Sequence, residues 1–344
     1  MKMRKARLCG PGVLEIEQAD RPLCPEGGLV VKVQACAICG TDVESFLHGR
    51  RMAQLPPQLG HELSGIVSEV GAGAGFFEVG DRVVLNQSIP CGECPDCQRG
   101  RENLCDRTLR IGGGFADYLA IPAAAVRKGN LLPMPAGLSY RAATIAEALA
   151  AVVNGQDFLD VTLGDTVLVI GAGAVGCLHG QLARAQGASR VILADLNAQR
   201  LKMAGEVSGA DLLIDSSSEN LIARVKAETG GLGAEKVIVA CSSGAVQEEA
   251  LQMVAKRGRI SYFGFTFKEW PWIRFDSNAC HYREFFVTGA FAYSRRQFQL
   301  ALDLIARGTI RAESLITHVF PLERLGEALQ TMKQGIGLKI LVEL

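Results

Sequence analysis

The sequence predicts a two-domain α/β protein, in which a β-rich, barrel-like domain is followed by a parallel sheet covered by helices. The chain has 344 residues, whereas a single domain usually has about 100–200. Short apolar runs separated by Gly and Pro fill the stretch to about residue 79. From about residue 139, continuous apolar runs alternate with helical patterns. This change of pattern predicts two different architectures in one chain.

The N-terminal part is predicted to form short strands bounded by turns. Residues 30–34 and 65–70 are apolar runs rich in valine and isoleucine, and residues 79–84 form a turn followed by another strand. Closely spaced strands with turn residues between them are typical of an antiparallel, barrel-like domain.

The later part alternates strands and helices. A helix is predicted from Ser139 to Val153, with Ser139 as its N-cap. Residues 166–170 form an uninterrupted apolar strand, typical of a strand buried on both faces. The remaining predicted elements are strands at 191–194, 237–240, 259–263 and 339–342, and helices at 175–186, 196–208 and 297–306. Most of this alternation predicts βαβ units and a parallel sheet.

Composition excludes several classes of function. The 36 Lys and Arg residues balance the 36 Asp and Glu residues, so no basic surplus is available for nucleic-acid phosphates. The longest apolar run, at about 166–178, is interrupted by three glycines and is shorter than the roughly 20 residues of a membrane helix. The basic N-terminus precedes no apolar signal core. We therefore expect a cytoplasmic protein without nucleic acid or membrane as partner.

A glycine-rich turn lies between the strand at 166–170 and the next helix. Its G-x-G-x-x-G pattern comprises Gly171, Gly173 and Gly176, with Ala174 and Val175 opening the helix. The first Gly permits a tight turn, the second lets the backbone approach a pyrophosphate, and the third lets helix and strand pack closely. Strand, turn and helix together predict a dinucleotide-binding turn rather than a merely close turn.

An acid follows at the expected spacing. Asp195 ends the next strand, 24 residues after Gly171, where a carboxylate can accept hydrogen bonds from both ribose hydroxyls and repel a 2′-phosphate. Asp195 therefore favours NAD over NADP, and Arg200 is placed to stack on adenine. The alternative is that Asp195 only caps the helix beginning near Leu196.

Four cysteines lie within fifteen residues, in the pattern C-x2-C-x2-C-x7-C. Four thiolates on one short lobe can enclose a tetrahedral Zn²⁺ with no open position, which predicts a structural site. Two alternatives are a pair of disulfides, disfavoured in a reducing compartment, and an iron–sulfur cluster, whose usual last spacing differs. The cysteines are Cys91, Cys94, Cys97 and Cys105.

A second set of metal-binding residue types stands apart from this lobe. Cys39 precedes Thr41, and His61 precedes Glu62. Thiolate, imidazole and carboxylate suit a catalytic zinc that keeps one position open. On residue type alone, a buried cysteine and a satisfied His–Glu pair are the simpler interpretation.

The order of these motifs resembles the zinc-containing medium-chain alcohol dehydrogenase superfamily, over essentially the whole chain. The segments 145–149 and 195–201 resemble its sorbitol and threonine dehydrogenase branch. The motifs that carry the resemblance are residues 39–42, 60–65, the four-cysteine lobe, 112–118 and 171–176.

The resemblance implies a GroES-like catalytic domain at residues 1–148, with the structural-zinc lobe at about 90–106. It implies an NAD-binding Rossmann domain at 149–288 and a C-terminal return to the catalytic domain at 289–344. The family also implies a homodimer or homotetramer, with residues 285–289 as the candidate edge strand.

The resemblance also implies roles for individual residues. Cys39 and His61 would ligate the catalytic zinc, and Glu62 would be a ligand or a close alternative. Glu147 matches the acid that binds zinc directly or through its water. Thr41 matches the hydroxyl that passes on the alcohol proton. With the structural site, this implies two Zn²⁺ per subunit and NAD.

We therefore expect hydride transfer between NAD and a secondary alcohol of a polyol or sugar-derived substrate. One alternative is L-threonine or another amino alcohol, which would need an anion site that the sequence does not identify. Another is a non-catalytic, zinc-stabilised NAD-binding sensor or scaffold, which would have no need of an open zinc site.

Three positions depart from the family pattern. Glu44 stands where many relatives have a histidine that extends the proton relay. Ala148 replaces a proline next to Glu147, and Ala292 replaces an arginine that contacts the polyol in sorbitol dehydrogenases. The last departure argues against sorbitol itself as the substrate.

Overall fold

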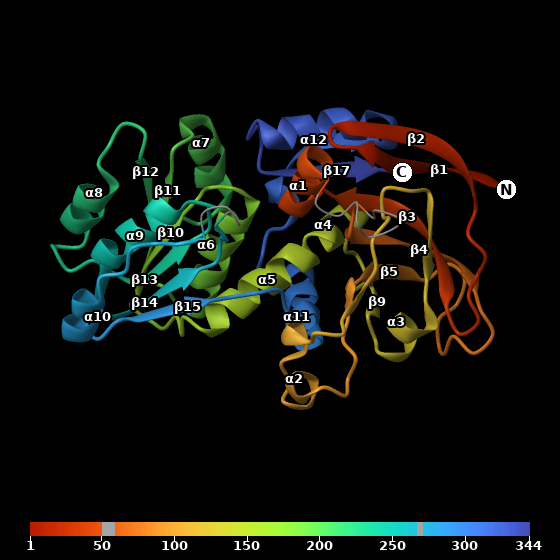
Figure 1. The fold of residues 1–344 in the computed structure, drawn as a ribbon, viewed down its shortest axis with the longest axis horizontal. Coiled ribbons are helices and arrows are strands. Elements are labelled where there is room, and N and C mark those ends of the chain that lie inside the picture. The colour runs from red at the N-terminus through yellow and green to blue at the C-terminus, as the bar shows by residue number, and fades with distance from the viewer. Residues whose placement is uncertain (50–58, 267–270) are drawn as a thin grey trace. The chain divides into compact units, whose positions relative to one another are not determined.

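A computed structural model describes residues 1–49, 59–266 and 271–344. The chain folds into two compact units. The first unit comprises residues 1–150, 293–308 and 312–344, and the second comprises 151–292 and 309–311. The first unit is therefore built from both ends of the chain (Figure 1).

The first unit contains a mostly antiparallel sheet of seven strands within the described residues, in the order β16-β17-β3-β4-β5-β9, with β8 also paired to β3. Only β16 and β17 pair in parallel. The strands of this unit are β1 (Lys2–Gly10), β2 (Val13–Asp20), β3 (Leu29–Ala37), β4 (Glu62–Val70), β5 (Arg82–Leu85), β6 (Ser88–Ile89), β7 (Leu109–Arg110), β8 (Tyr118–Ile121), β9 (Leu131–Pro133), β16 (Ile316–Pro321) and β17 (Lys339–Glu343).

Alternating apolar positions on these strands form the core of the first unit. Leu29, Val31 and Val33 on β3 are fully buried against Leu63 and Val67 of β4. The helices that accompany this unit are α1 (Gly40–His48), α2 (Pro95–Gln98), α3 (Ala123–Arg127), α4 (Tyr140–Thr144), α11 (Arg295–Ala306) and α12 (Leu325–Lys333), with 3₁₀ turns η1 (Glu102–Leu104), η2 (Glu313–Leu315) and η3 (Leu322–Arg324).

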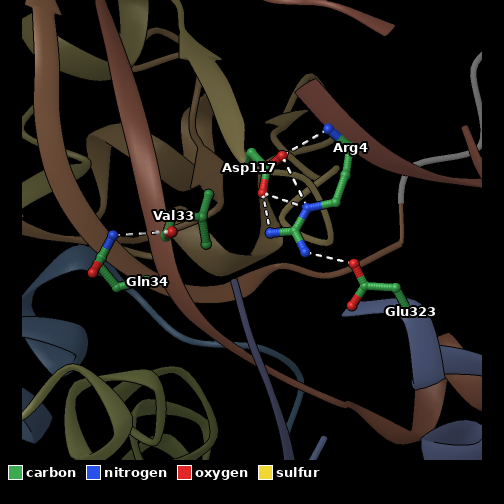
Figure 2. A network of polar contacts seen from close by, with 5 residues as sticks. All are labelled: Arg4, Val33, Gln34, Asp117 and Glu323. Atoms are coloured by element: carbon green, nitrogen blue, oxygen red, sulfur yellow. Dashed lines mark hydrogen bonds and ion pairs between the residues drawn. The ribbon is translucent and has the colours of Figure 1, made fainter. Parts of the chain in front are cut away.

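The two ends of the chain are joined within the first unit. The last strand, β17, pairs antiparallel with β3, so Leu341 lies opposite Ala37 (Figure 1). Arg4 on β1 donates to both carboxylate oxygens of Asp117 and also to Glu323 in η3 (Figure 2). The backbone N–H of Arg4 also bonds Asp117. This network ties the first strand to the C-terminal segment.

The second unit is built on a six-stranded parallel sheet within the described residues, in the order β12-β11-β10-β13-β14-β15. The chain runs outward from β10 through β11 to β12, and then from β13 to β15 on the other side. The strand order therefore reverses between β10 and β13. The strands are β10 (Thr166–Ile170), β11 (Arg190–Asp195), β12 (Leu212–Asp215), β13 (Ala234–Val239), β14 (Val254–Tyr262) and β15 (Phe286–Gly289).

The helices α6 and α7 connect β10, β11 and β12 in turn, and α9 and α10 lie in the connections from β13 to β14 and from β14 to β15. Strands such as β10 are buried on both faces, as their continuous apolar sequence predicts. The helices are α5 (Ala146–Asp157), which enters this unit from the first, α6 (Ala174–Gln186), α7 (Ala198–Val207), α8 (Leu221–Glu228), α9 (Gly244–Met253) and α10 (Ser277–Arg283).

The helix predicted from Ser139 to Val153 is divided in two. Ser139 is the N-cap, as predicted, since its hydroxyl accepts the N–H of Ala142. However, α4 ends at Thr144, and α5 begins after Ile145. The Thr144 hydroxyl donates to the Arg141 carbonyl, a local bond that competes with continued helix. The division leaves Glu147 in the first turn of α5.

None of the helices in the described ranges is both long enough and apolar enough to cross a membrane.

Candidate active site

The glycine-rich turn follows β10, where the strand order of the parallel sheet reverses. Gly171 has a φ of +116°, and its N–H bonds the Ala194 carbonyl of β11 at 2.7 Å. A Cβ on Gly176 would lie 1.8 Å from the Gly171 oxygen, so only glycine fits there. Gly173 is the N-cap of α6, and its Cβ position is open. A dinucleotide pyrophosphate can therefore approach this helix N-terminus.

Asp195, at the end of β11, is oriented by backbone groups on both sides. One carboxylate oxygen accepts the Ala172 N–H of the glycine-rich turn at 2.6 Å, and the other accepts the Asn197 N–H at 2.8 Å. The N-cap of α7 is Asn197, whose side chain accepts the Arg200 N–H. The Arg200 guanidinium lies 3.9 Å from Asp195. The acid therefore stands beside the turn and is not the cap of α7.

Cys39, His61 and Glu62 lie together in the first unit, with one ligand atom of each within 4.8 Å of the others. Cys39 is the N-cap of α1, and the His–Glu pair opens β4. Asp42 joins the two segments, because its carboxylate accepts the N–H of Cys39 at 2.9 Å and that of Gly60 at 3.0 Å. Asp42 therefore holds the two segments that present the three candidate ligands.

The electrostatics of this cluster favour a cation. Burial alone would lower the pKa of His61, but the negative charges of Asp42 and Cys39 outweigh it and raise this pKa to about 10. In the part of the chain that the structure describes, Nδ1 of His61 and the Thr41 hydroxyl are buried without a hydrogen-bond partner. Sulfur, nitrogen and oxygen donors that converge in this way fit a zinc ion.

Glu62 has a buried partner that the sequence did not indicate. The Lys339 ammonium, on β17, lies 2.5 Å from a Glu62 oxygen, and both side chains are at most 5% exposed. Burial would lower the pKa of Lys339, but the charges of Glu62 and Cys39 raise it. A lysine at the start of an apolar strand carries no local signal for this role, because the pairing of β17 with β3 creates it.

Glu147 lies outside the group of three. Its Oε1 accepts a hydrogen bond from the Gln87 amide at 3.0 Å. The buried Tyr293 shares this environment, since burial and then the charge of Glu147 raise its pKa far above the usual range. The sequence identified Glu147 through the family resemblance, whereas nothing in the local pattern pointed to Gln87.

The four cysteines of the lobe also converge, with one sulfur of each within 4.8 Å of the others. The N–H groups of Glu93 and Cys94 point at the Cys91 sulfur and lower the pKa of this thiol to about 6. All four candidate ligands in this group are cysteine sulfurs, which fits a closed, structural zinc site.

Family models match most of both units. An alcohol dehydrogenase GroES-like domain matches residues 25–136, and a zinc-binding dehydrogenase model matches residues 174–307. A sorbitol dehydrogenase of Halalkalibacterium halodurans is 29% identical over 97% of this chain and 96% of its own length. A D-xylulose reductase A of Aspergillus oryzae is 30% identical over 96% of this chain and 94% of its own.

Among solved structures, a protein of Sinorhizobium meliloti described as a zinc-binding dehydrogenase and bound to NADP superposes with a TM-score of 0.91. The two chains are 29% identical, and all of each is covered. The chain belongs to the zinc-containing medium-chain alcohol dehydrogenase superfamily, in its polyol dehydrogenase branch. The predicted family and the predicted combination of a GroES-like with a Rossmann domain are therefore confirmed.

Proposed function

We propose that this protein is a zinc-dependent oxidoreductase that transfers hydride between NAD and a secondary alcohol of a polyol or sugar-derived substrate. The observation that carries the proposal is the convergence of the partly buried Cys39 with the buried His61 and Glu62, in a chain that also carries a dinucleotide turn. Relatives named for sorbitol, D-xylulose and D-arabitol phosphate support a polyol-type substrate. These names do not favour the amino-alcohol alternative, and the buried open metal site argues against a scaffold.

In this mechanism Cys39, His61 and Glu62 would hold the catalytic zinc, which when bound lowers the pKa of a substrate hydroxyl. The Thr41 hydroxyl is buried, without a partner in the described residues, and can both accept the substrate proton and donate its own. Asp42 keeps the ligand-bearing segments in place. Glu147 contributes a negative charge beside the cluster. The protein holds the reacting carbon against the nicotinamide and excludes water.

We further propose two zinc ions per chain, one at this site and one held by the four cysteines of the lobe. We also propose a homodimer or homotetramer formed through β15, the edge strand of the parallel sheet. Phe286 on this strand is 54% exposed, and pairing with a second copy would cover both the phenyl ring and the open edge. Light scattering of purified protein tests the oligomer, and metal analysis tests the zinc content.

The preference for NAD depends on Asp195. Asp195→Ser removes the charge that would repel a 2′-phosphate but keeps an acceptor for the Ala172 N–H. We expect the kcat/KM ratio of NAD to NADP to fall by about tenfold or more, equivalent to at least about 1.4 kcal/mol.

Asp215→Ser is the matched control, since Asp215 ends the neighbouring strand opposite Asp195. An unchanged cofactor ratio in Asp195→Ser would contradict the assignment of cofactor preference to this carboxylate.

The reaction class is tested by following reduced-nicotinamide absorbance with a panel of polyols, sugar phosphates, aminocyclitols and L-threonine. Cys39→Ser should abolish turnover, whereas Cys9→Ser, at an exposed thiol, should not. Turnover of L-threonine alone would favour the amino-alcohol alternative. Dinucleotide binding without turnover of any alcohol, in zinc-replete protein, would favour the non-catalytic one.

A further inference from the structure

Two carboxylates flank the candidate metal site, and each has a different partner. Glu62 lies against the Lys339 ammonium and is one of the three converging ligands. Glu147 lies against a neutral amide, that of Gln87, and is outside the group of three. Burial, and then the charges of Glu147 and Glu62, raise the pKa of Tyr293, so both carboxylates lie near this buried side chain. The structure thus distinguishes the two acids by what holds each of them.

Gln87 is itself held firmly. It follows β5, it is 8% exposed, and its carbonyl accepts the Ile111 N–H at 2.9 Å. The fully buried Asn130 donates its amide to the carbonyls of Asn86 at 3.2 Å and Ser88 at 2.6 Å, on either side of Gln87. The Asn86 N–H bonds the Asn130 carbonyl in return, at 2.7 Å. The backbone that carries the Gln87 amide is therefore fixed on both sides.

An amide N–H directs a carboxylate without neutralising it. Without the Gln87 amide, the Glu147 oxygen would lose this hydrogen-bond donor. A metal ion bound nearby would then be the positive charge that attracts the carboxylate most strongly. A fourth protein ligand would then compete for the coordination position that a catalytic zinc keeps open.

We propose that Gln87 is a positioning residue that holds Glu147 apart from Cys39, His61 and Glu62, so that the fourth metal position stays open to the substrate hydroxyl. This inference rests on the proposed function of the site. It assigns no proton transfer to Gln87 and concerns only the direction of the Glu147 carboxylate. Partners of this kind behind a ligand shell commonly change metal affinity or activity by about 10–100-fold.

The test uses Gln87→Met, which keeps the length of the side chain and removes the donor. Cobalt is introduced in place of zinc, and the d–d absorption of the open site is isolated by subtracting the spectrum of Cys39→Ser. We expect the d–d bands to shift, because Glu147 takes the fourth coordination position in place of water. We also expect kcat/KM to fall about 10–100-fold, mainly through KM, because substrate then competes with Glu147.

Gln34→Met is the matched control. Within the described residues of the same unit, the Gln34 amide donates to the adjacent Val33 carbonyl, at 3.3 Å (Figure 2). We expect it to leave spectrum and KM unchanged. If Gln87→Met does not fold, Gln87→Asn retains an amide that is too short to reach Glu147, and the same spectral change is expected.

The second arm repeats Gln87→Met in a Glu147→Gln background. If Gln87 acts through Glu147, the second substitution should add less than about a threefold loss, since coupled residues are non-additive. An unchanged cobalt spectrum, or an equal loss in both backgrounds, overturns the proposal. A spectral change that depends on Glu147 supports the role of Gln87 even if no tested alcohol is turned over. Wild-type protein that binds no metal at Cys39 overturns both this proposal and the proposed function.

Discussion

At the scale of single residues, His179 on α6 is a buried imidazole whose surroundings disfavour its protonated form. It is 0% exposed, its Nδ1 accepts a hydrogen bond from the Gln156 amide at 3.2 Å, and Phe263 lies edge-on at 4.6 Å between ring centroids. Burial lowers its pKa to about 3, from 6.5. The folded protein therefore holds it neutral, while the unfolded chain takes up a proton below about pH 6.5.

We expect this group to make the free energy of unfolding fall as pH decreases from about 6.5 towards 3. The loss should reach about 2–3 kcal/mol at pH 4.5, and the group should contribute no pH dependence above about pH 7. Denaturant unfolding at several pH values measures it. His179→Asn should flatten this part of the profile, whereas His281→Asn, at an exposed imidazole, should not. Identical slopes in wild type and His179→Asn would contradict the assignment.

Part of the site was accessible from sequence because it is encoded locally. Cys39 and Thr41 share one segment, and His61 and Glu62 share another. Their residue types permit a metal site, and the order of the motifs along the chain, through the family resemblance, made the metal the preferred interpretation. Gln87 and Lys339 were not accessible in this way. Lys339 meets Glu62 only because the last strand pairs beside β3, and Gln87 meets Glu147 across 60 residues of chain. Long-range packing creates these contacts without any periodic pattern.

At the scale of elements, the turn between β10 and α6 separates two roles of glycine. Gly176→Ala would force a methyl group against the Gly171 oxygen, and we expect a loss of about 1–3 kcal/mol in the free energy of unfolding together with weaker dinucleotide binding.

Gly173→Ala meets nothing within 4 Å, so its stability cost should stay below about 1 kcal/mol, the usual scale for an alanine N-cap. Its dinucleotide affinity should still fall, because the methyl group faces the place of the pyrophosphate. Thermal unfolding and calorimetric titration with NAD separate the two effects. Equal loss of stability in both variants would contradict this assignment.

The four-cysteine lobe is an element with little core of its own. Its helix α2 has no buried residue, and only Cys94 and Cys105 of the four thiols are buried. Metal cross-links must then supply what apolar packing does not. Cys105→Ser should lower the zinc content by about one ion per chain and speed proteolysis within about 90–106. Cys280→Ser, in the other unit, should do neither, and unchanged zinc in Cys105→Ser would exclude a structural site here.

Elements that rest on local patterns were the most predictable ones. The strands β10 and β11 and the helix α6 follow from continuous apolar runs and a glycine-rich turn. The break after α4 did not follow, because it falls at one residue, Ile145, inside an otherwise helical sequence, beside a Thr144 hydroxyl that bonds the Arg141 carbonyl. Propensity summed over a window does not resolve such a competition.

At the scale of the whole molecule, the Arg4 network joins the first strand to the C-terminal segment of the first unit. Arg4→Met keeps the aliphatic stem and removes the bonds to Asp117 and Glu323. We expect a loss of about 1–2 kcal/mol in the free energy of unfolding, reduced at high salt because Arg4 is partly exposed. Arg7→Met breaks a more exposed hairpin ion pair with Glu15 and should cost less, because water screens an exposed ion pair. Denaturant titrations compare the two, and equal losses would contradict a special role for Arg4.

The combination of a GroES-like and a Rossmann domain was predictable from motif order. Local pattern showed the change from short, turn-bounded strands to βαβ units. Local pattern did not show that the C-terminal segment belongs to the first unit, because the sequence of a strand such as β17 does not indicate which strand it pairs with. Only resemblance to a family with that connectivity supplied this point.

The placement of β17 has a consequence for how the molecule is made. The strands β3 and β4 leave the ribosome early, together with Cys39, His61 and Glu62. The strand β17, which pairs with β3, and the Lys339 counter-charge are translated only after the whole second unit. During synthesis Glu62, Cys39 and His61 therefore exist without the Lys339 ammonium group, and the edge of β3 that pairs with β17 is open. The parallel sheet of the second unit, at residues 166–289, lies between the N-terminal and C-terminal parts of the first unit in the sequence. It can therefore assemble before the first unit is complete. Emergence of β17, rather than emergence of the ligands, is the event that completes the metal pocket.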